Sequence, residues 1–358
     1  MSRPLRAVIH TQSLQHNLER VREFAPSSKV MAVIKADGYG HGITTVASTL
    51  KQADALAVAS IDEALQIKQS VPDSPPICLL EGVFRIDELN EVFNSGFALV
   101  LHNEEQVRYL ESSQTDKPVP VWLKIDTGMN RLGIDANSFE DLFKRLQSCS
   151  SVSEIGLMTH FACADDAQNS MTKTQLQQFE HAIGSKTAER SAANSAGIVQ
   201  WPGSHFEWVR PGIMLYGSSP VLGKTAGELG LKPVMSLESE LVALHPVKKG
   251  DSVGYGATWI AERDTTIGVV ACGYGDGYPR HARSGTPVLV NNQRQSLVGR
   301  VSMDMITVDI GDQPRAKIGD PVVLWGEGLS VDEIAASADT ISYELLCQVT
   351  RRVEREVV

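Results

Sequence analysis

Short apolar runs alternate with amphipathic segments between residues 28 and 217. This alternation is typical of repeated strand–helix units, in which buried strands are covered by helices. The runs that fit strands are Val30–Ile34, Ala55–Ala59, Pro76–Leu80, Phe97–Leu101, Val119–Ile125, Glu154–His160, Arg190–Ala193 and Glu207–Arg210. Segments between them, such as Ile61–Gln69 and Ile86–Phe93, have the spacing of helices. Eight such units predict a closed parallel (β/α)8 TIM-type barrel, with an open doubly wound sheet as the alternative.

A second pattern follows the stretch Gly223–Gly230, whose Gly, Lys and Glu residues indicate a linker. Beyond it, apolar and polar residues alternate with period two, as in strands with one buried face. The expected strands are Ser236–Leu244, Thr265–Ala271, Thr286–Val290, Ser296–Ile310 and Pro321–Trp325, and the expected helices are Val331–Ala338 and Tyr343–Arg351. We therefore predict two domains, a barrel over residues 1–229 and a mostly β C-terminal domain over residues 230–358.

Length and charge narrow the classes of function. A chain of 358 residues is long enough for a barrel and a smaller domain. Its 43 acidic and 33 basic residues give a net charge of -10, which argues against a nucleic-acid partner. The five cysteines are scattered and form no CxxC motif, which is typical of a reducing cytosol. We see no signal peptide or membrane span, so we expect a cytoplasmic protein without membrane contact.

One lysine has an unusual setting in this pattern. Lys35 follows the apolar run Val30–Ile34 and precedes the glycine-rich loop Gly38–Gly42, so we expect it to end a strand inside a cleft. Desolvation there favours the neutral amine, which is a competent nucleophile toward an aldehyde. The glycines allow close approach of a bulky ligand, and Tyr39 offers a hydroxyl to a phosphate. These features suggest pyridoxal phosphate, whereas the alternative is a solvated surface lysine.

Other polar residues also follow predicted strand ends, where the sites of such barrels lie. They are Lys124, His160, Asn194 and Arg210. A second glycine loop, Lys124–Gly133, presents Arg131, whose planar guanidinium suits a carboxylate or a phenolate. The stretches Asn194–Gly197 and Arg210–Ile213 fit a helix cap and a turn, whose exposed amides bind anions well. A lone histidine such as His160 is more often a core or surface residue than a catalyst.

The stretch Met31–Gly42, Met-Ala-Val-Ile-Lys-Ala-Asp-Gly-Tyr-Gly-His-Gly, resembles the cofactor-lysine signature of the alanine racemases, which are barrel-type pyridoxal phosphate enzymes. The Lys124, Asn194 and Arg210 stretches described above also resemble motifs of this family. Two further matches are Val253–Thr258 and Gly299–Asp304 in the C-terminal half. The resemblance covers nearly the whole chain and implies a barrel followed by a β domain.

The resemblance implies a role for each matching residue. The two bases are expected to be Lys35, which also carries the cofactor as an aldimine, and Tyr255, with Lys35 on the D-face and Tyr255 on the L-face. The expected cofactor contacts are Lys35, Tyr39, His160, Asn194, Ser195, Arg210, Gly212, Ile213 and Tyr343, with Arg210 facing the pyridine nitrogen. The expected substrate contacts are Arg131 and Met303, and the expected entrance residues are Asp165, Tyr274, Arg280, Arg300 and Ile341. Lys124 matches a position that is carbamylated in several members.

The implied activity is that of an isomerase that interconverts L-alanine and D-alanine by two-base proton transfer, for peptidoglycan or for alanine catabolism. In the family a head-to-tail homodimer brings the residue matching Tyr255 into the other subunit's site, so each site is expected to need two chains. The alternatives are a racemase of broader amino-acid specificity and a pyridoxal phosphate-binding protein without turnover. A decarboxylase on the same barrel would lack the Tyr255 motif and the matched carboxylate contacts.

Overall fold

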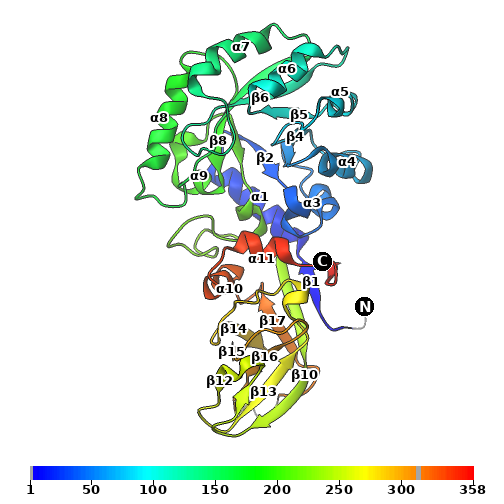
Figure 1. Ribbon diagram of the computed structural model, residues 1–358, viewed down its shortest axis with the longest axis vertical. Helices are drawn as coiled ribbons and strands as arrows, with labels where there is room; N and C mark the ends of the chain where they lie inside the picture. Colours follow the sequence, from blue (N-terminus) through cyan, green and yellow to red (C-terminus); the bar gives the residue numbers. More distant parts are fainter. Residues whose placement is uncertain (1–2, 312–315) are drawn as a thin grey trace.

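The computed structural model describes residues 3–311 and 316–358. Figure 1 shows an elongated molecule with a barrel at one end and a β domain at the other, and with α11 and β1 between them. No helix in the described ranges has both the length and the apolarity needed to cross a membrane.

The N-terminal part is a closed barrel of parallel strands, which confirms the predicted fold class. Its strands are β2 (Lys29–Val33), β3 (Ala55–Val58), β4 (Ile77–Leu79), β5 (Ala98–Leu101), β6 (Val119–Lys124), β7 (Val152–Met158), β8 (Arg190–Asn194) and β9 (Trp208–Arg210). The pairing of Lys29 with Trp208 and of Val30 with Val209 joins the first strand to the last. This closure excludes the open doubly wound sheet.

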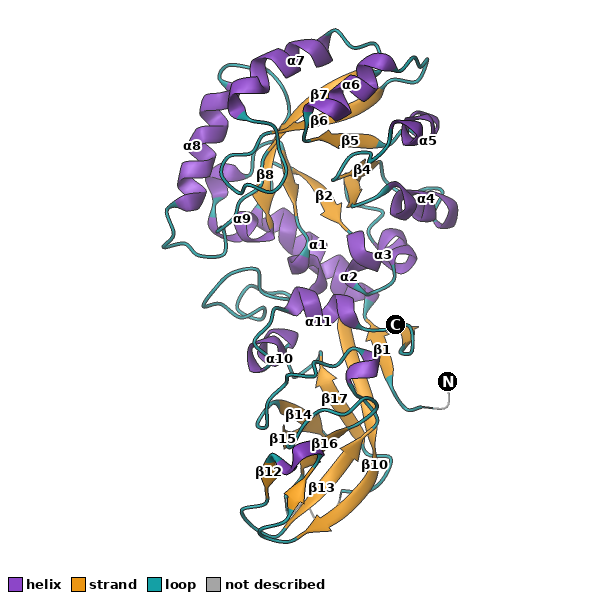
Figure 2. Cartoon of the chain, in the orientation of Figure 1, coloured by secondary structure: helices purple, strands orange, loops and turns teal. Residues whose placement is uncertain are grey.

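Helices surround the barrel strands, as Figure 2 shows. They are α1 (Thr11–Phe24), α3 (Ile43–Thr49), α4 (Ile61–Ser70), α5 (Leu89–Ser95), α6 (Glu104–Ser112), α7 (Phe139–Gln147), α8 (Met171–Ile183) and α9 (Ser195–Gln200). In α7 the buried residues Phe139, Leu142, Phe143 and Leu146 recur at helical spacing, so one apolar stripe packs on the strands. The expected helix at Ile86–Phe93 begins instead as a 3-10 turn, Ile86–Glu88, before α5.

The C-terminal part is an antiparallel-rich sheet with the order β13-β16-β15-β14-β17-β10-β1-β18. Its strands are β1 (Arg6–Ile9), β10 (Met235–Val247), β13 (Thr265–Val270), β14 (Pro287–Val290), β15 (Gln293–Leu297), β16 (Ile306–Asp309), β17 (Pro321–Trp325) and β18 (Glu354–Val357). A small sheet of β11 (Ser252–Val253) and β12 (Trp259–Ile260) and the helices α10 (Val331–Ser337) and α11 (Ser342–Gln348) accompany it.

Two features of this sheet differ from the sequence pattern. The expected single strand Ser296–Ile310 is wrong, because β15 and β16 are separated by a loop. Gly299 in that loop has a φ of +73°, and a Cβ there would lie 2.8 Å from the Val253 oxygen, so the chain turns out of the strand. Strand β1 was not among the predicted strands, and it pairs antiparallel with β10 and parallel with β18.

Candidate active site

A cavity of about 520 Å³ lies at the carboxyl ends of the barrel strands. The sequence-predicted residues that line it are Lys35, Tyr39, Lys124, Arg131, His160, Asn194, Ser195, Arg210, Gly212, Ile213 and Tyr343. Tyr343 comes from α11 of the C-terminal part, and the others come from the barrel. The lining residues that sequence reasoning missed are Val33, Leu80, Glu81, Leu132 and Met158. Val33 and Leu132 lie within the motif stretches Met31–Gly42 and Lys124–Gly133, which could have indicated them, and Leu80, Glu81 and Met158 lie at or just beyond strand ends.

The remaining predicted residues do not line this cavity in the same chain. They are Asp165, Tyr255, Tyr274, Arg280, Arg300, Met303 and Ile341. Tyr255 is 69% exposed and Met303 is 53% exposed, and both lie in the C-terminal part. One chain therefore encloses Lys35 without bringing the expected second base into the lining.

Lys35 begins a backbone turn of the opposite hand to an ordinary helix. The residues Ala36–Tyr39 all have φ between +51° and +62°. The Gly40 N–H donates to the Ala36 oxygen at 2.9 Å, and the Asp37 carboxylate accepts from the Ile43 N–H at 2.8 Å. Left-handed geometry costs about 1–2 kcal/mol for each non-glycine residue, and such strain is concentrated at functional sites. The turn leaves Lys35 half-buried and directs Tyr39 into the protein.

Two aromatic residues that sequence reasoning missed support this turn. Tyr216 stacks on Tyr39 with ring centroids 4.6 Å apart and donates to the Val33 oxygen at 3.1 Å. The His41 Nδ1 lies 3.0 Å from the Gly38 oxygen and 2.8 Å from the Tyr39 oxygen. Burial lowers the pKa of His41 to about 4, so at neutral pH its uncharged ring donates from Nδ1. The aromatic pair and this donor hold Tyr39 in place.

Several hydrogen-bond donors at the cavity have no acceptor in the part of the chain that the structure describes. The Ser195 hydroxyl oxygen accepts from the Gly212 N–H at 2.8 Å, so this amide is already engaged. Within the described ranges, the Ile213 N–H and the hydroxyls of Tyr39 and Tyr343 bond to no acceptor. Burial raises the pKa of both tyrosines, which keeps their hydroxyls protonated as donors. These three donors suit the oxygens of a phosphate.

Arg210 is almost fully buried and is held by four acceptors. Its Nη1 donates to the Ser191 hydroxyl at 2.6 Å, and its Nη2 donates to the Thr159 oxygen at 2.6 Å, to the His160 Nδ1 and to the Ala192 oxygen. Burial and the nearby cation Arg210 hold the pKa of His160 well below its ordinary value, so its neutral ring accepts. The Nε has no acceptor among the described residues, which leaves one N–H for a ligand nitrogen.

The cavity has an excess of positive charge. Lys35, Lys124, Arg131 and Arg210 line it, and none of them forms a salt bridge within the described part of the chain. Burial, together with the neighbouring cations, lowers the pKa of Lys124 to about 8. An anionic ligand would balance these charges.

The residues fit pyridoxal phosphate on these observations. Donors without acceptors would take the phosphate, the Arg210 Nε would face the pyridine nitrogen, and the Lys35 amine would meet the aldehyde. A Cβ at Gly212 would lie 2.5 Å from the Tyr39 hydroxyl, so only glycine leaves this hydroxyl in place.

Two family models match the chain. Alanine racemase, N-terminal domain, matches residues 9–220, and alanine racemase, C-terminal domain, matches residues 234–357. Alanine racemase of Nitrosococcus oceani is 51% identical over 98% of both chains, and biosynthetic alanine racemase of Escherichia coli is 49% identical over 98% of both. The structure of biosynthetic alanine racemase from Pseudomonas aeruginosa covers 99% of both chains with a TM-score of 0.96 and 47% identity. That of alanine racemase from Bartonella henselae, with covalently bound pyridoxal phosphate, covers 99% of both with a TM-score of 0.89 and 29% identity.

Proposed function

This chain belongs to the alanine racemase family of pyridoxal phosphate-dependent isomerases, and on that premise we propose that Lys35 and Tyr255 are the two bases that interconvert L-alanine and D-alanine. The observation that carries the proposal is the cationic cavity around Lys35, with its free donors for a phosphate.

Pyridoxal phosphate supplies the electron withdrawal that makes the α-proton of alanine acidic. The Lys35 amine would hold or release a proton on one face of the α-carbon, and the Tyr255 hydroxyl would do so on the opposite face. Removal of the proton on one face and its return on the other inverts the carbon. Arg210 would donate from Nε without giving up its proton, because its pKa of about 10 keeps it charged.

A second copy of the chain would complete each site. Tyr255 is 69% exposed and does not line the Lys35 cavity, so a homodimer that inserts Tyr255 of one chain into the cavity of the other unites the two bases. Exposed Tyr274 and Met303 lie in the same C-terminal part and would enter with it. In this arrangement Met303 would offer its amide to the substrate carboxylate with Arg131. The proposed entrance residues are Asp165, Tyr274, Arg280, Arg300 and Ile341.

We also propose that Lys124 is carbamylated. Its pKa of about 8 leaves a substantial fraction of neutral amine at mildly alkaline pH. The neutral amine would add to carbon dioxide with loss of one proton, which converts a cation into an anion beside Arg131. The intact mass of the protein, measured with and without bicarbonate, tests this modification.

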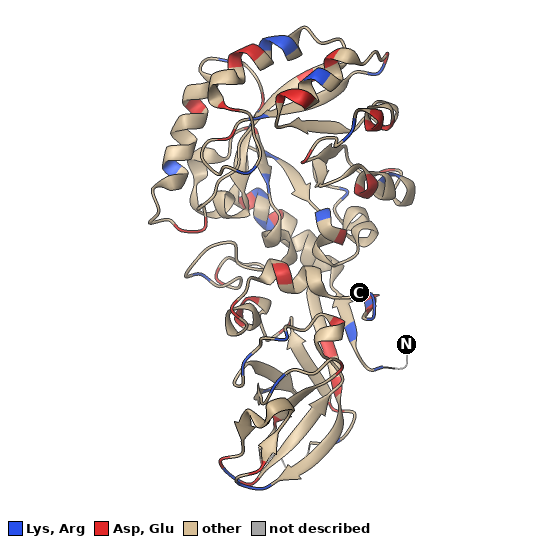
Figure 3. Ribbon diagram, viewed as in Figure 1, with Lys and Arg blue, Asp and Glu red and all other residues tan. Residues whose placement is uncertain are grey.

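The names of two relatives support one of the two proposed cellular roles. Those from Escherichia coli and Pseudomonas aeruginosa are named biosynthetic, which supports production of D-alanine for peptidoglycan over a catabolic role. The five cysteines are all free, which supports a cytoplasmic location. Figure 3 shows acidic residues interspersed with basic ones over the barrel helices, as expected for a protein without a nucleic-acid partner.

The proposed activity is tested with the purified protein, pyridoxal phosphate and a panel of single L- and D-amino acids. Chiral chromatography should show conversion of either alanine enantiomer to the racemate, and much slower conversion of larger amino acids. Equal turnover across the panel would instead favour a racemase of broader specificity. If the protein bound pyridoxal phosphate but converted no amino acid, the result would favour a pyridoxal phosphate-binding protein without turnover.

A further inference from the structure

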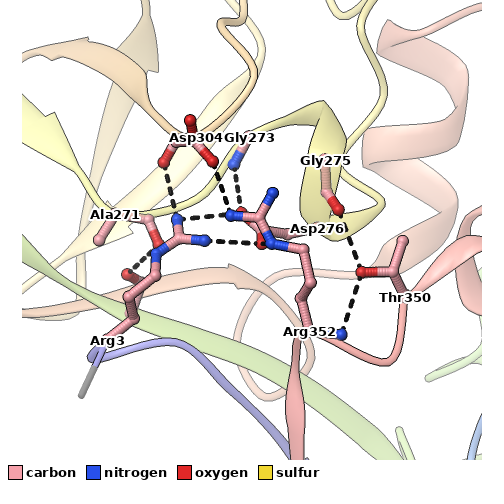
Figure 4. Close-up of polar contacts among 9 residues, drawn as sticks. Arg3, Ala271, Gly273, Gly275, Asp276, Asp304, Thr350 and Arg352 are labelled. Carbon is pink, nitrogen blue, oxygen red and sulfur yellow. Dashed lines mark hydrogen bonds and ion pairs between the residues drawn. The ribbon is translucent and has the colours of Figure 1, made fainter. Parts of the chain in front are cut away.

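Asp276 is a buried carboxylate at the centre of a charged cluster in the C-terminal part (Figure 4). Arg3 donates to its two oxygens at 2.8 and 3.1 Å, and the Arg352 Nε lies 3.3 Å from Oδ1. The Gly273 N–H donates to Oδ2 at 3.0 Å, so the carboxylate also closes the 3-10 turn Tyr274–Asp276. Asp276 therefore holds three segments that are distant in sequence.

The same cluster fixes a second loop beside this turn. Arg3 donates to the backbone carbonyl oxygen of Asp304 at 2.8 Å, and Arg352 donates to the Asp304 carboxylate at 2.6 Å. The Gly275 N–H donates to the Met303 oxygen at 2.8 Å. A Cβ at Gly273 would overlap the backbone of Met303, so the two loops lie directly on one another.

One hydrogen bond between the loops sets the direction of the Met303 amide. The Tyr274 N–H donates to the Ser302 oxygen at 3.0 Å. Because a trans peptide is planar, its C=O and N–H point in opposite directions, and the Met303 N–H therefore points away from the Tyr274 turn. This N–H has no acceptor within residues 3–311 and 316–358, and the Met303 side chain is 53% exposed.

A third segment connects the cluster to the cofactor cavity. The Thr350 N–H donates to the backbone carbonyl oxygen of Asp276 at 3.0 Å, and the Thr350 hydroxyl donates to the backbone carbonyl oxygen of Gly275 at 3.1 Å. Thr350 closely follows α11, whose Tyr343 lines the cavity of the same chain. The charged cluster thus touches both the loops that face outward and the segment that follows Tyr343.

We propose that Asp276 is a positioning residue for substrate binding, which acts through the Tyr274 turn to aim the Met303 N–H at the substrate carboxylate. This inference rests on the proposed function, which places Met303 in the site of the partner chain. Arg3 and Arg352 hold Asp276 in place and share the role. Asp276 itself touches neither substrate nor cofactor in this scheme.

The decisive variant is Asp276→Asn, which keeps the shape of the side chain but removes the charge that binds two guanidinium groups. A misdirected amide weakens binding of the substrate and the transition state alike, so KM for both alanine enantiomers should rise about tenfold while kcat changes less than about twofold. The inhibition constant of propionate, a carboxylate that cannot react, should rise by the same factor. Retention of pyridoxal phosphate should stay unchanged.

The matched control is Asp320→Asn. Asp320 is another buried carboxylate of the C-terminal part, which accepts from the Lys317 N–H at 2.9 Å and from Asn291 at 2.7 Å. Its loss should leave KM and the propionate constant unchanged. If Asp276→Asn does not fold, Arg3→Gln and Arg352→Gln should show smaller rises in both constants, since these side chains are partly exposed.

Unchanged KM and unchanged propionate inhibition in a folded Asp276→Asn enzyme would overturn the inference, and so would a loss confined to kcat. If Asp276→Asn does not fold, unchanged KM and unchanged propionate inhibition in both arginine variants would also overturn the inference. A native protein that does not racemise alanine would instead refute the proposed function, which separates the two failures.

Discussion

The residues of the cavity differ in how clearly their sequence context indicates them. Lys35 stands at a strand end and Arg131 in a glycine loop, but local pattern alone left both open to being surface residues, and the family resemblance selected them. Tyr216 and His41 act on Tyr39 through stacking and through a ring nitrogen, and neither contact follows from spacing along the chain. The burial expected for Lys35 could be checked only in the structure, which shows this residue half-buried.

At the residue scale, Tyr255→Phe should separate the two faces of the substrate. Solvent deuterium exchange into L-alanine should fall by a factor of about 10²–10⁴, because the face served by Tyr255 loses its base. Exchange into D-alanine without inversion should persist through Lys35. The control is Tyr278→Phe, which removes a buried hydroxyl that has no hydrogen-bond partner among the residues that the structure describes. A fall of less than roughly tenfold with L-alanine would exclude Tyr255 as a base.

His41 should make the stability of the fold depend on pH. Its pKa is about 4 in the folded chain and about 6.5 when unfolded, so the unfolded state binds more protons between these values. The free energy of unfolding should therefore be retained above pH 6.5 and decrease by up to roughly 3 kcal/mol as the pH falls to 4. Urea denaturation over this range should show a shallower decrease for His41→Gln. Identical pH profiles would contradict the assignment.

At the scale of elements, strand positions in the barrel were predictable because each strand is a short apolar run between polar segments. The turn at Ala36–Tyr39 was not, because Ala and Tyr disfavour left-handed geometry and Asp adopts it only at isolated positions, so tertiary contacts must impose the run. The loop between β15 and β16 was missed for a related reason, since Val298 and Val301 are buried and continue the apolar pattern through it.

Gly212→Ala tests the contact between the segment after β9 and the Lys35 turn. Gly212 has a φ of −120° and a ψ of −96°, and this ψ lies outside the α and β regions of other residues, so backbone strain should add to the displacement of the Tyr39 hydroxyl by the Cβ. The dissociation constant of pyridoxal phosphate should rise at least about tenfold, since one phosphate donor is displaced. Gly203→Ala, with open space around its Cβ, should bind the cofactor as the native protein does. Equal affinities in fluorescence titrations would show that Tyr39 does not hold the phosphate.

At the scale of the whole molecule, the sequence predicted a barrel and a β domain but not how their segments interleave. Period-two alternation identified the β domain, yet β1 precedes the barrel in the chain and still joins that sheet. Four residues, Arg6–Ile9, are too few to reveal a sheet partner that begins at Met235. The proposal that each site is shared by two chains likewise came from family resemblance rather than from pattern.

Complementation tests the shared site. A Lys35→Ala chain and a Tyr255→Phe chain should each be nearly inactive, and after subunit exchange each heterodimer should hold one site with both bases. An equal mixture should then recover about one quarter of the native specific activity, since about half the dimers are mixed. Exchange is verified by native mass spectrometry. Absence of recovery in a mixture with proven heterodimers would place both bases in one chain.

The position of β1 in the chain also determines when this strand can pair with its neighbours during synthesis. All the barrel strands, from Lys29 to Arg210, are made before β10, the first of the two neighbours of β1. Domains generally fold as units while the chain is still growing. We therefore expect the nascent barrel to close while β1 still exposes two unpaired edges, a state in which strands are prone to pair with other chains. Arg6 within this short strand places a charge on it during that interval, which opposes such pairing.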